Sequence, residues 1–149
     1  MSTDVDPAPL TAIEARFAIA DVVHAYALAI RRDLPEDAAA LFAKDGWFEI
    51  RHGHPSKAGH SLRARLEGRQ GVLDFLLPNK GKPHPVPLIH NLMIEVTGET
   101  ATASSVMEAQ VLGTGHTVFG EYQDSFRKEQ GQWRFASRIY TIFTTALPV

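Results

Sequence analysis

The side chains of this chain best suited to acid–base chemistry are His90, Asp33 and Tyr26. An imidazole titrates near neutral pH, and a nearby carboxylate fixes its tautomer and raises its basicity. In a dry pocket such a base removes a proton next to a carbonyl or a leaving group, and a buried phenol donates a hydrogen bond to the developing oxyanion. Brought together in one pocket, such a set would suit cofactor-free elimination or isomerisation, with His90 as base, Asp33 orienting it and Tyr26 polarising the oxygen.

Each of the three also has a structural interpretation. His90 stands at the start of a predicted strand, where a histidine can simply face solvent. Asp33 precedes a predicted helix and could serve as its N-cap by accepting a backbone amide hydrogen. Tyr26 lies on the inner face of a predicted helix, where a tyrosine often belongs to the core.

Further residues are candidates for ligand contacts. Arg31 could bind a carboxylate or phenolate bidentately, although a cation in the last turn of a helix is also favourable in itself. Tyr122 and Asp124 alternate on a predicted strand and therefore share a face, so both are candidates to line the same cavity. Alternatively, Asp124 pairs with an arginine of a neighbouring strand, either Arg138 or Arg127.

The histidines of one loop raise the question of a metal site. His52, His54 and His60 lie close together, and His84 follows further along the chain. No acid or cysteine stands at a fitting spacing, which zinc sites of this kind normally require. We therefore predict no metal ion and no cofactor.

Composition bounds the class of protein. The 149 residues suffice for one domain, which we place at residues 11–149 after a flexible arm of residues 1–10. The net charge of −2 and the lack of a basic stripe argue against a nucleic-acid partner. No apolar run approaches the roughly 18 residues of a membrane span, and no signal peptide is recognisable, so we expect a cytoplasmic protein. The absence of cysteine excludes thiolate chemistry.

The hydrophobic pattern predicts an α+β domain with its helices first. Apolar residues recur at helical spacing over residues 11–30 and place Ile13 and Phe17 on the buried face. A second helix begins at Pro35, which suits the first position of a helix. A short third helix is predicted over residues 71–77.

Strands account for most of the remaining sequence. Residues 46–51 and 61–68 read as strands separated by a loop. Residues 80–87 are rich in proline and read as a second loop. Residues 88–140 then contain four strands joined by three glycine-containing turns, which predicts a curved antiparallel sheet with the helices on one face.

Four segments resemble a known family: HAYALAIRRDLPEDAAALFAKDGWFE, EGRQGVLDFL, HNLMIEVTGETATA and GEYQDSFRKEQGQWRFASR. They are similar to SnoaL-like proteins of the nuclear transport factor 2-like superfamily, and the resemblance spans residues 11–140. It implies a cystatin-like cone, in which a bent sheet wraps around a long helix and encloses a pocket for a small hydrophobic ligand. Relatives include ketosteroid isomerase, scytalone dehydratase and polyketide cyclases, and they commonly dimerise. We therefore expect a homodimer formed through the sheet.

The resemblance also shows where this chain departs from the family. Dehydratase-like members carry Y-x-x-x-x-D-x-x-D at the end of the first helix, and counting from Tyr26 places Arg31 and Leu34 at the two acidic positions. Asp33 is the nearest acid. It reaches the pocket if the helix ends early or the chain kinks before Pro35.

A second departure concerns the family's histidine. This residue lies four positions before an asparagine, which Asn91 matches, but its position holds Pro87. His90 lies next to Asn91. Strand alternation puts His90 on the same face as Leu92 and Ile94, and we predict that this face points inward. The pair could then be rebuilt from Asp33 and His90, with Asn91 contacting the substrate.

Three functions follow. The first is a cofactor-free lyase or isomerase acting on a small, apolar, oxygenated molecule. The second is a protein that binds a small hydrophobic ligand without chemistry, and the third is an assembly role for the outer face of the sheet. The sequence contains no phosphate loop, nucleotide fingerprint or nucleophile elbow, which argues against kinases, Rossmann oxidoreductases and α/β-hydrolases.

Overall fold

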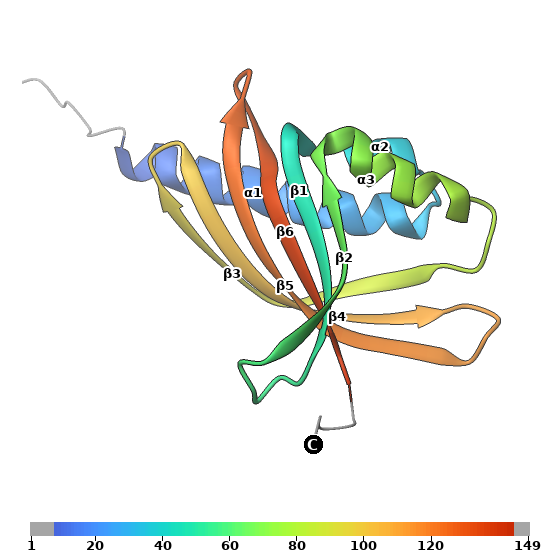
Figure 1. The fold of residues 1–149 in the computed structure, drawn as a ribbon. Helices are drawn as coiled ribbons and strands as arrows, with labels where there is room; N and C mark the ends of the chain where they lie inside the picture. The colour runs from blue at the N-terminus through green and yellow to red at the C-terminus, as the bar shows by residue number, and fades with distance from the viewer. Residues whose placement is uncertain (1–7, 145–149) are drawn as a thin grey trace, which may run out of the picture.

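A long helix crosses the concave face of a strongly bent sheet (Figure 1). The computed structural model describes residues 8–144. Its helices are α1 (Ala8–Arg31), α2 (Pro35–Ala40) and α3 (Gly68–Leu76), with a short 3₁₀ turn η1 (Leu77–Asn79). Its strands are β1 (Phe42–Gly53), β2 (His60–Glu67), β3 (Pro85–Thr97), β4 (Thr100–Val111), β5 (His116–Glu129) and β6 (Gln132–Phe143). The predicted α+β class, with helices on one face of a curved sheet, is confirmed.

The six strands form one sheet in the order β2-β1-β6-β5-β4-β3. Four of the neighbouring pairs are antiparallel, but β1 and β6 run parallel. The chain crosses from β2 through α3 to the far edge, and the β3–β6 meander then brings β6 back beside β1. The antiparallel sheet predicted for residues 88–140 is confirmed by β3–β6. The pairing of β1 with β6 was not predicted, and it is parallel because adjacent strands that are distant in sequence need not alternate in direction.

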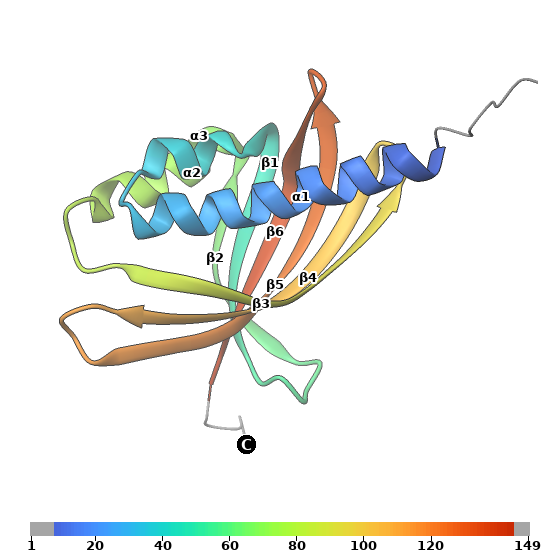
Figure 2. The ribbon, with the colours of Figure 1, turned by 180° about the vertical axis from the view of Figure 1, so that it is seen from behind.

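The helix α1 packs on the sheet through a face that the pattern did not identify. Figure 2, which views the molecule from behind, shows α1 lying across the strands. Its buried stripe runs through Ile19, Val23 and Tyr26, whereas Ile13 is 50% exposed and Phe17 is 71% exposed. The helix is apolar around most of its circumference, so spacing alone did not select the buried side.

The element boundaries differ by a few residues from those predicted. The helix α1 already includes residues 8–10 of the predicted arm, while residues 1–7 lie outside the described part. Residues 52–53 and 85–87, predicted as loop, extend β1 and β3. None of the helices within residues 8–144 has the length and apolar character needed to cross a membrane.

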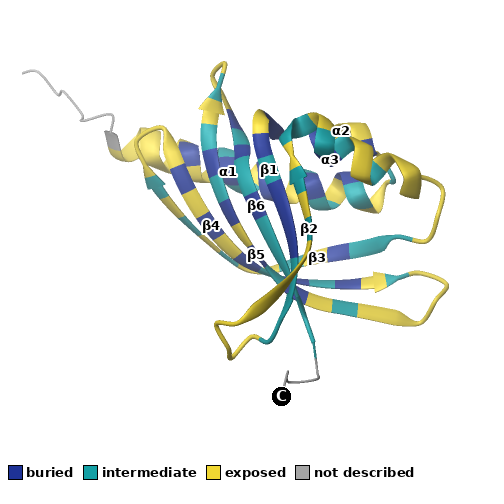
Figure 3. Ribbon diagram, in the orientation of Figure 1, coloured by how far each residue is buried: buried dark blue, intermediate teal, exposed yellow. Residues whose placement is uncertain are grey.

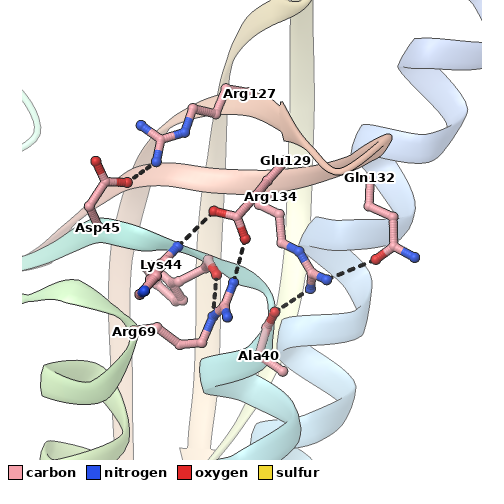
Figure 4. A network of polar contacts seen from close by, with 9 residues as sticks. Ala40, Lys44, Asp45, Arg69, Arg127, Glu129, Gln132 and Arg134 are labelled. Atoms are coloured by element: carbon pink, nitrogen blue, oxygen red, sulfur yellow. Dashed lines mark hydrogen bonds and ion pairs between the residues drawn. The ribbon is translucent and has the colours of Figure 1, made fainter.

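A polar network ties the tip of the β5–β6 hairpin to the start of β1 and to α3 (Figure 4). Glu129 accepts hydrogen bonds from the backbone amide of Lys44 (2.8 Å) and from Arg69 Nη2 (2.7 Å). Arg69 Nε donates to the carbonyl oxygen of Phe42 (2.8 Å). Two further contacts join Arg127 to Asp45 and Arg134 to the carbonyl oxygen of Ala40. The network joins the tip of the hairpin to the region where α2 leads into β1.

A β-bulge at Asn91 changes which side chains of β3 face the helix. His90 pairs with Val106 and Met93 pairs with Ser104, so two residues of β3 lie opposite one residue of β4. Asn91 adopts the left-handed conformation with φ of 52°. Before the bulge Ile89 packs on the core, and after it Leu92 does so. Figure 3 shows the resulting alternation of buried and exposed positions in the sheet.

We predict that Asn91→Val destabilises the fold by about 1–2 kcal/mol, because a β-branched residue is strained at positive φ. Asn91→Gly is the matched control, since glycine adopts this conformation without a steric penalty. Urea unfolding measures the free energy of unfolding of both variants. Equal losses for Val and Gly would show that the side chain of Asn91 matters and its backbone conformation does not.

Candidate functional site

A cavity of about 330 Å³ lies between the C-terminal half of α1, the helix α3 and the bent sheet. Most of its lining is apolar, with Ile30, Phe48, Ile50 and Met107 among the contributors. The volume is in the lower part of the range of small-molecule pockets. Its polar groups fall into two sets, one at the buried end and one at the mouth.

The buried end carries three phenols. The chain has only three tyrosines, and Tyr26, Tyr122 and Tyr140 all line the cavity. The ring centroids of Tyr26 and Tyr122 are 6.4 Å apart, and those of Tyr122 and Tyr140 are 5.1 Å apart. Burial raises the pKa of all three hydroxyls, so they stay protonated near neutral pH.

None of these three hydroxyls has a hydrogen-bond partner within residues 8–144. Buried phenols usually have one. A ligand oxygen in the cavity would therefore meet donors that no protein group already occupies. Tyr26 is a core residue, as its alternative interpretation held, but no group within residues 8–144 satisfies its hydroxyl.

An ion pair lies next to the phenols, inside the protein. Arg138 Nε donates to Asp124 Oδ1 at 2.8 Å and Arg138 Nη2 donates to Asp124 Oδ2 at 3.0 Å, and both side chains are completely buried. Burial pushes the pKa of Asp124 upwards and the guanidinium pulls it down, and we take the two charge-assisted hydrogen bonds to keep the pair ionised. Asp124 does not line the cavity, so the structure places it in the pair with Arg138 that was its alternative interpretation, away from the predicted ligand contact.

Asp33 stands at the mouth of the cavity. Its backbone is left-handed, with φ of 56°, and its Oδ2 accepts a hydrogen bond from the amide of Gly81 at 2.7 Å. Asp33 lines the cavity, as predicted for a chain that turns before Pro35. It is not the N-cap of α2, because Leu34 holds that position without a side-chain hydrogen bond.

His84 lies beside Asp33 on the loop that leads into β3, and it also lines the cavity. Its Nδ1 is 2.9 Å from the carbonyl oxygen of Lys82, and its Nε2 is 3.3 Å from the carbonyl oxygen of Arg31. The Lys82 carbonyl raises the pKa of His84 above its usual value, and burial opposes this. The Arg31 carbonyl and the charge of Asp33 add to the increase. The protonated ring, which donates through both nitrogens, fits this site best.

From the sequence, His84 was a candidate only as a metal ligand and not as an acid or base. A signal was present, because His84 stands between Pro83 and Pro85. A residue before proline favours extended backbone, which here leads directly into β3. His84 lies seven residues before Asn91 and not four, so the spacing of the family's histidine does not identify it.

The structure does not bring His90 to the cavity. Its Nε2 is 3.3 Å from Glu108 Oε2, and its side chain is 45% exposed. The predicted inward orientation is wrong because the bulge at Asn91 shifts the alternation by one residue. Asp33 and His90 therefore do not form the predicted pair, since each has another partner.

Two predicted ligand contacts also lie elsewhere. Asn91 is exposed within the bulge, and Arg31 is exposed at the end of α1 with only its carbonyl oxygen directed at His84. Neither lines the cavity. Tyr122 does line it, and Pro87, at the family's usual histidine position, forms part of its apolar wall.

The loop histidines make contacts of their own. His52 Nε2 is 3.1 Å from Arg63 Nη1, and His54 Nδ1 is 2.6 Å from Ser56 Oγ. Within the described part of the chain, no three histidine or acidic side chains are grouped as a metal ion would require.

We predict that the stabilisation contributed by His84 fades as the pH rises. Its folded-state pKa lies above the unfolded value of about 6.5, so its contribution is complete below that pH and is lost as the pH rises through the folded-state pKa. The contribution of His84 is measured by urea unfolding of the native protein and of His84→Gln from about pH 5 to about pH 9. The difference in unfolding free energy should be largest at the acidic end.

His60→Gln, at an exposed position on β2, is the control for a histidine outside the cavity. A pH-independent difference for His84→Gln would show that its ring acts by packing alone.

Solved structures similar to this chain share its fold. A Mycobacterium tuberculosis protein of unknown function, Rv3472, is 25% identical, with 92% of this chain and 76% of that chain covered and a TM-score of 0.74. Two Novosphingobium aromaticivorans proteins are similar. One is assigned as the beta subunit of an aromatic-ring-hydroxylating dioxygenase. It is 23% identical, with 93% of this chain and 95% of that chain covered and a TM-score of 0.74. The other is assigned as a scytalone dehydratase. It is 24% identical, with 92% of this chain and 89% of that chain covered and a TM-score of 0.68. Among the curated proteins, none matches.

The model of one family, described as the SnoaL-like domain, matches residues 11–139. This range contains all of the residues that line the cavity except Tyr140. The cone fold, the cavity and the match agree with the resemblance seen in the sequence. The chain therefore belongs to the SnoaL-like domain family.

Proposed function

We propose that this protein is a cofactor-free lyase or isomerase that acts by acid–base chemistry on a small, apolar, oxygenated molecule. The observation that carries the proposal is the meeting of two kinds of group in one apolar cavity. Three protonated phenols with no hydrogen-bond partner among residues 8–144 lie at its buried end, and the Asp33 carboxylate lies beside His84 at its mouth. The family and its relative assigned as a scytalone dehydratase are consistent with this chemistry.

The phenols would act on the oxygen of the substrate. When a proton leaves the carbon next to a carbonyl, negative charge develops on the oxygen, and a preorganised neutral donor stabilises that charge. Tyr26 and Tyr122 are both nearly completely buried, so their hydrogen bonds would form in a medium of low dielectric constant. A bound ketone would thus become more acidic at its neighbouring carbon.

The pair at the mouth would move the proton. Asp33 uses one oxygen to hold Gly81, which leaves Oδ1 to accept a proton from carbon. The protonated ring of His84 would then act as the acid, either returning a proton to carbon or protonating a leaving hydroxyl. Its longer contact, from Nε2 to the Arg31 carbonyl oxygen, is the one that a substrate oxygen would replace.

The alternative is a protein that binds a small hydrophobic ligand without chemistry. One observation favours it, because both ring nitrogens of His84 already face backbone carbonyl oxygens and so connect the loop to α1. In this case Asp33 and His84 would shape the mouth of the cavity, and the phenols would provide specificity for an oxygenated ligand. The homodimer through the sheet and the cytoplasmic location remain predictions.

The two functions differ in whether the protein labilises a carbon-bound proton. We propose β-tetralone, an apolar bicyclic ketone, as the probe, and its hydrogen–deuterium exchange in D₂O followed by NMR as the assay. The native protein should accelerate exchange next to the carbonyl, and Asp33→Asn should remove most of this acceleration, on the order of 10²-fold or more. Tyr26→Phe should reduce it by a smaller factor.

His90→Gln is the matched control and should exchange at the native rate, because His90 lies outside the cavity. Binding of the same ketone is followed in parallel by NMR line broadening. Binding without accelerated exchange would support the alternative function, and exchange that survives Asp33→Asn would contradict the assigned base.

A further inference from the structure

We infer that Asp124 is a positioning residue which, by neutralising Arg138, keeps Tyr122 and Tyr26 as uncharged hydrogen-bond donors in the cavity. The inference deepens the proposed function, on which its consequence for the substrate rests. Its test observes the phenols directly and needs neither a substrate nor an activity. The two ideas can therefore fail separately.

The geometry places a permanent cation directly against the phenols. The guanidinium carbon of Arg138 is 3.6 Å from the ring centroid of Tyr122 and 4.6 Å from that of Tyr26. The guanidinium is also 4.5 Å from the ring of Phe135, so aromatic faces surround much of it. Arg138 is completely buried, and an arginine cannot lose its charge in a protein.

Asp124 is the one carboxylate bonded to this cation within residues 8–144. Arg138 Nη1 is buried and has no hydrogen-bond partner in the described part of the chain. The inward positions of β4 beside it are Ala103, Ser105 and Met107, none of which carries charge. The buried Glu49 of β1 is already bonded to Arg51 and Arg65.

The remaining ionisable groups near Arg138 are the phenols themselves. They are Tyr122 of β5 and Tyr26 of α1, while Tyr140 of β6 interacts with these two phenols. A buried charge without a partner is strongly destabilising. If the carboxylate of Asp124 were absent, the nearest group able to supply a negative charge would be Tyr122. The carboxylate thus makes it unnecessary for a phenol to ionise.

The location of the negative charge on Asp124, with the phenols neutral, matters for what the cavity can bind. A phenolate accepts hydrogen bonds and repels a developing oxyanion, whereas a neutral phenol donates a hydrogen bond and stabilises it. The ion pair, although it does not line the cavity, would therefore determine the sign of the interaction between the cavity and a substrate oxygen.

The test is a spectrophotometric titration of tyrosine in Asp124→Asn, a substitution that keeps the shape of the side chain and removes its charge. Because all three tyrosines line the cavity, the absorbance of phenolate reports on no other site. We expect Asp124→Asn to gain one phenolate equivalent by about pH 9, below the ordinary tyrosine pKa of about 10. The native protein should show none at that pH.

Two double variants identify the groups involved. Tyr122→Phe combined with Asp124→Asn should lose the early phenolate, because the group that ionises has been removed. Arg138→Gln combined with Asp124→Asn should also lose it, because the cation has been removed. A purely structural role for Asp124 predicts no early phenolate in any variant, and that result in folded Asp124→Asn would overturn the inference.

Asp124→Asn could also fail to fold at neutral pH. The inference then predicts that circular dichroism shows more folded protein at about pH 10 than at about pH 7, since ionised Tyr122 would replace the missing charge. The gain should disappear in the double variant with Tyr122→Phe. A variant that is equally unfolded at both values would overturn the inference as well.

Discussion

Tyr26 stands where the packed core of the cone gives way to the cavity, and the rest of the structure depends on how this side chain packs. Its ring lies within 6.1–6.4 Å of the rings of Phe42, Phe48, Phe135 and Tyr122, measured between centroids. The first three join α1 to β1 and β6. On the other side the ring lines the cavity with Tyr122. One side chain thus anchors the helix on the sheet and marks the buried end of the candidate site.

The mouth is held by a different kind of interaction. The turn after α1 and the loop before β3 meet through Asp33, which accepts the amide of Gly81, and through His84, which faces the carbonyl of Arg31. These contacts satisfy backbone groups that an apolar cavity wall could not. The same side chains that close the fold here are therefore the ones with suitable chemistry, so stability and any catalytic role must be separated by measurements with different readouts.

The sequence predicted the fold well because its signals were local. The turns around Gly98, Gly113 and Gly131 all exist as expected, and the order of helices before the meander placed the helices on one face. The phenols of Tyr26 and Tyr122 could be assigned to the cavity for the same reason, since a helix face and a strand face follow from spacing. The parallel pairing of β1 with β6 could not, because it joins segments far apart in the chain.

The site could be predicted only in part, and the errors have one physical origin. Strand alternation assigns a face correctly only if no residue is inserted, and the bulge at Asn91 inserts one. That single residue moves His90 to the outer surface. His84 precedes β3 and belongs to no repeating pattern, so only its proline neighbours hinted at an extended backbone. Side chains at irregular backbone are where functional groups gather and where periodicity carries no information.

The three phenols also indicate how the cavity would gain its affinity. A buried hydroxyl bonded to the protein must exchange that bond for one to a ligand, and the net gain is small. Tyr26, Tyr122 and Tyr140 have no such protein partner within residues 8–144, so a ligand oxygen competes with no other protein group. With the charge of Arg138 already balanced by Asp124, these donors present little net charge. A neutral carbonyl oxygen that becomes negative during reaction fits such a cavity better than a ligand that is already charged.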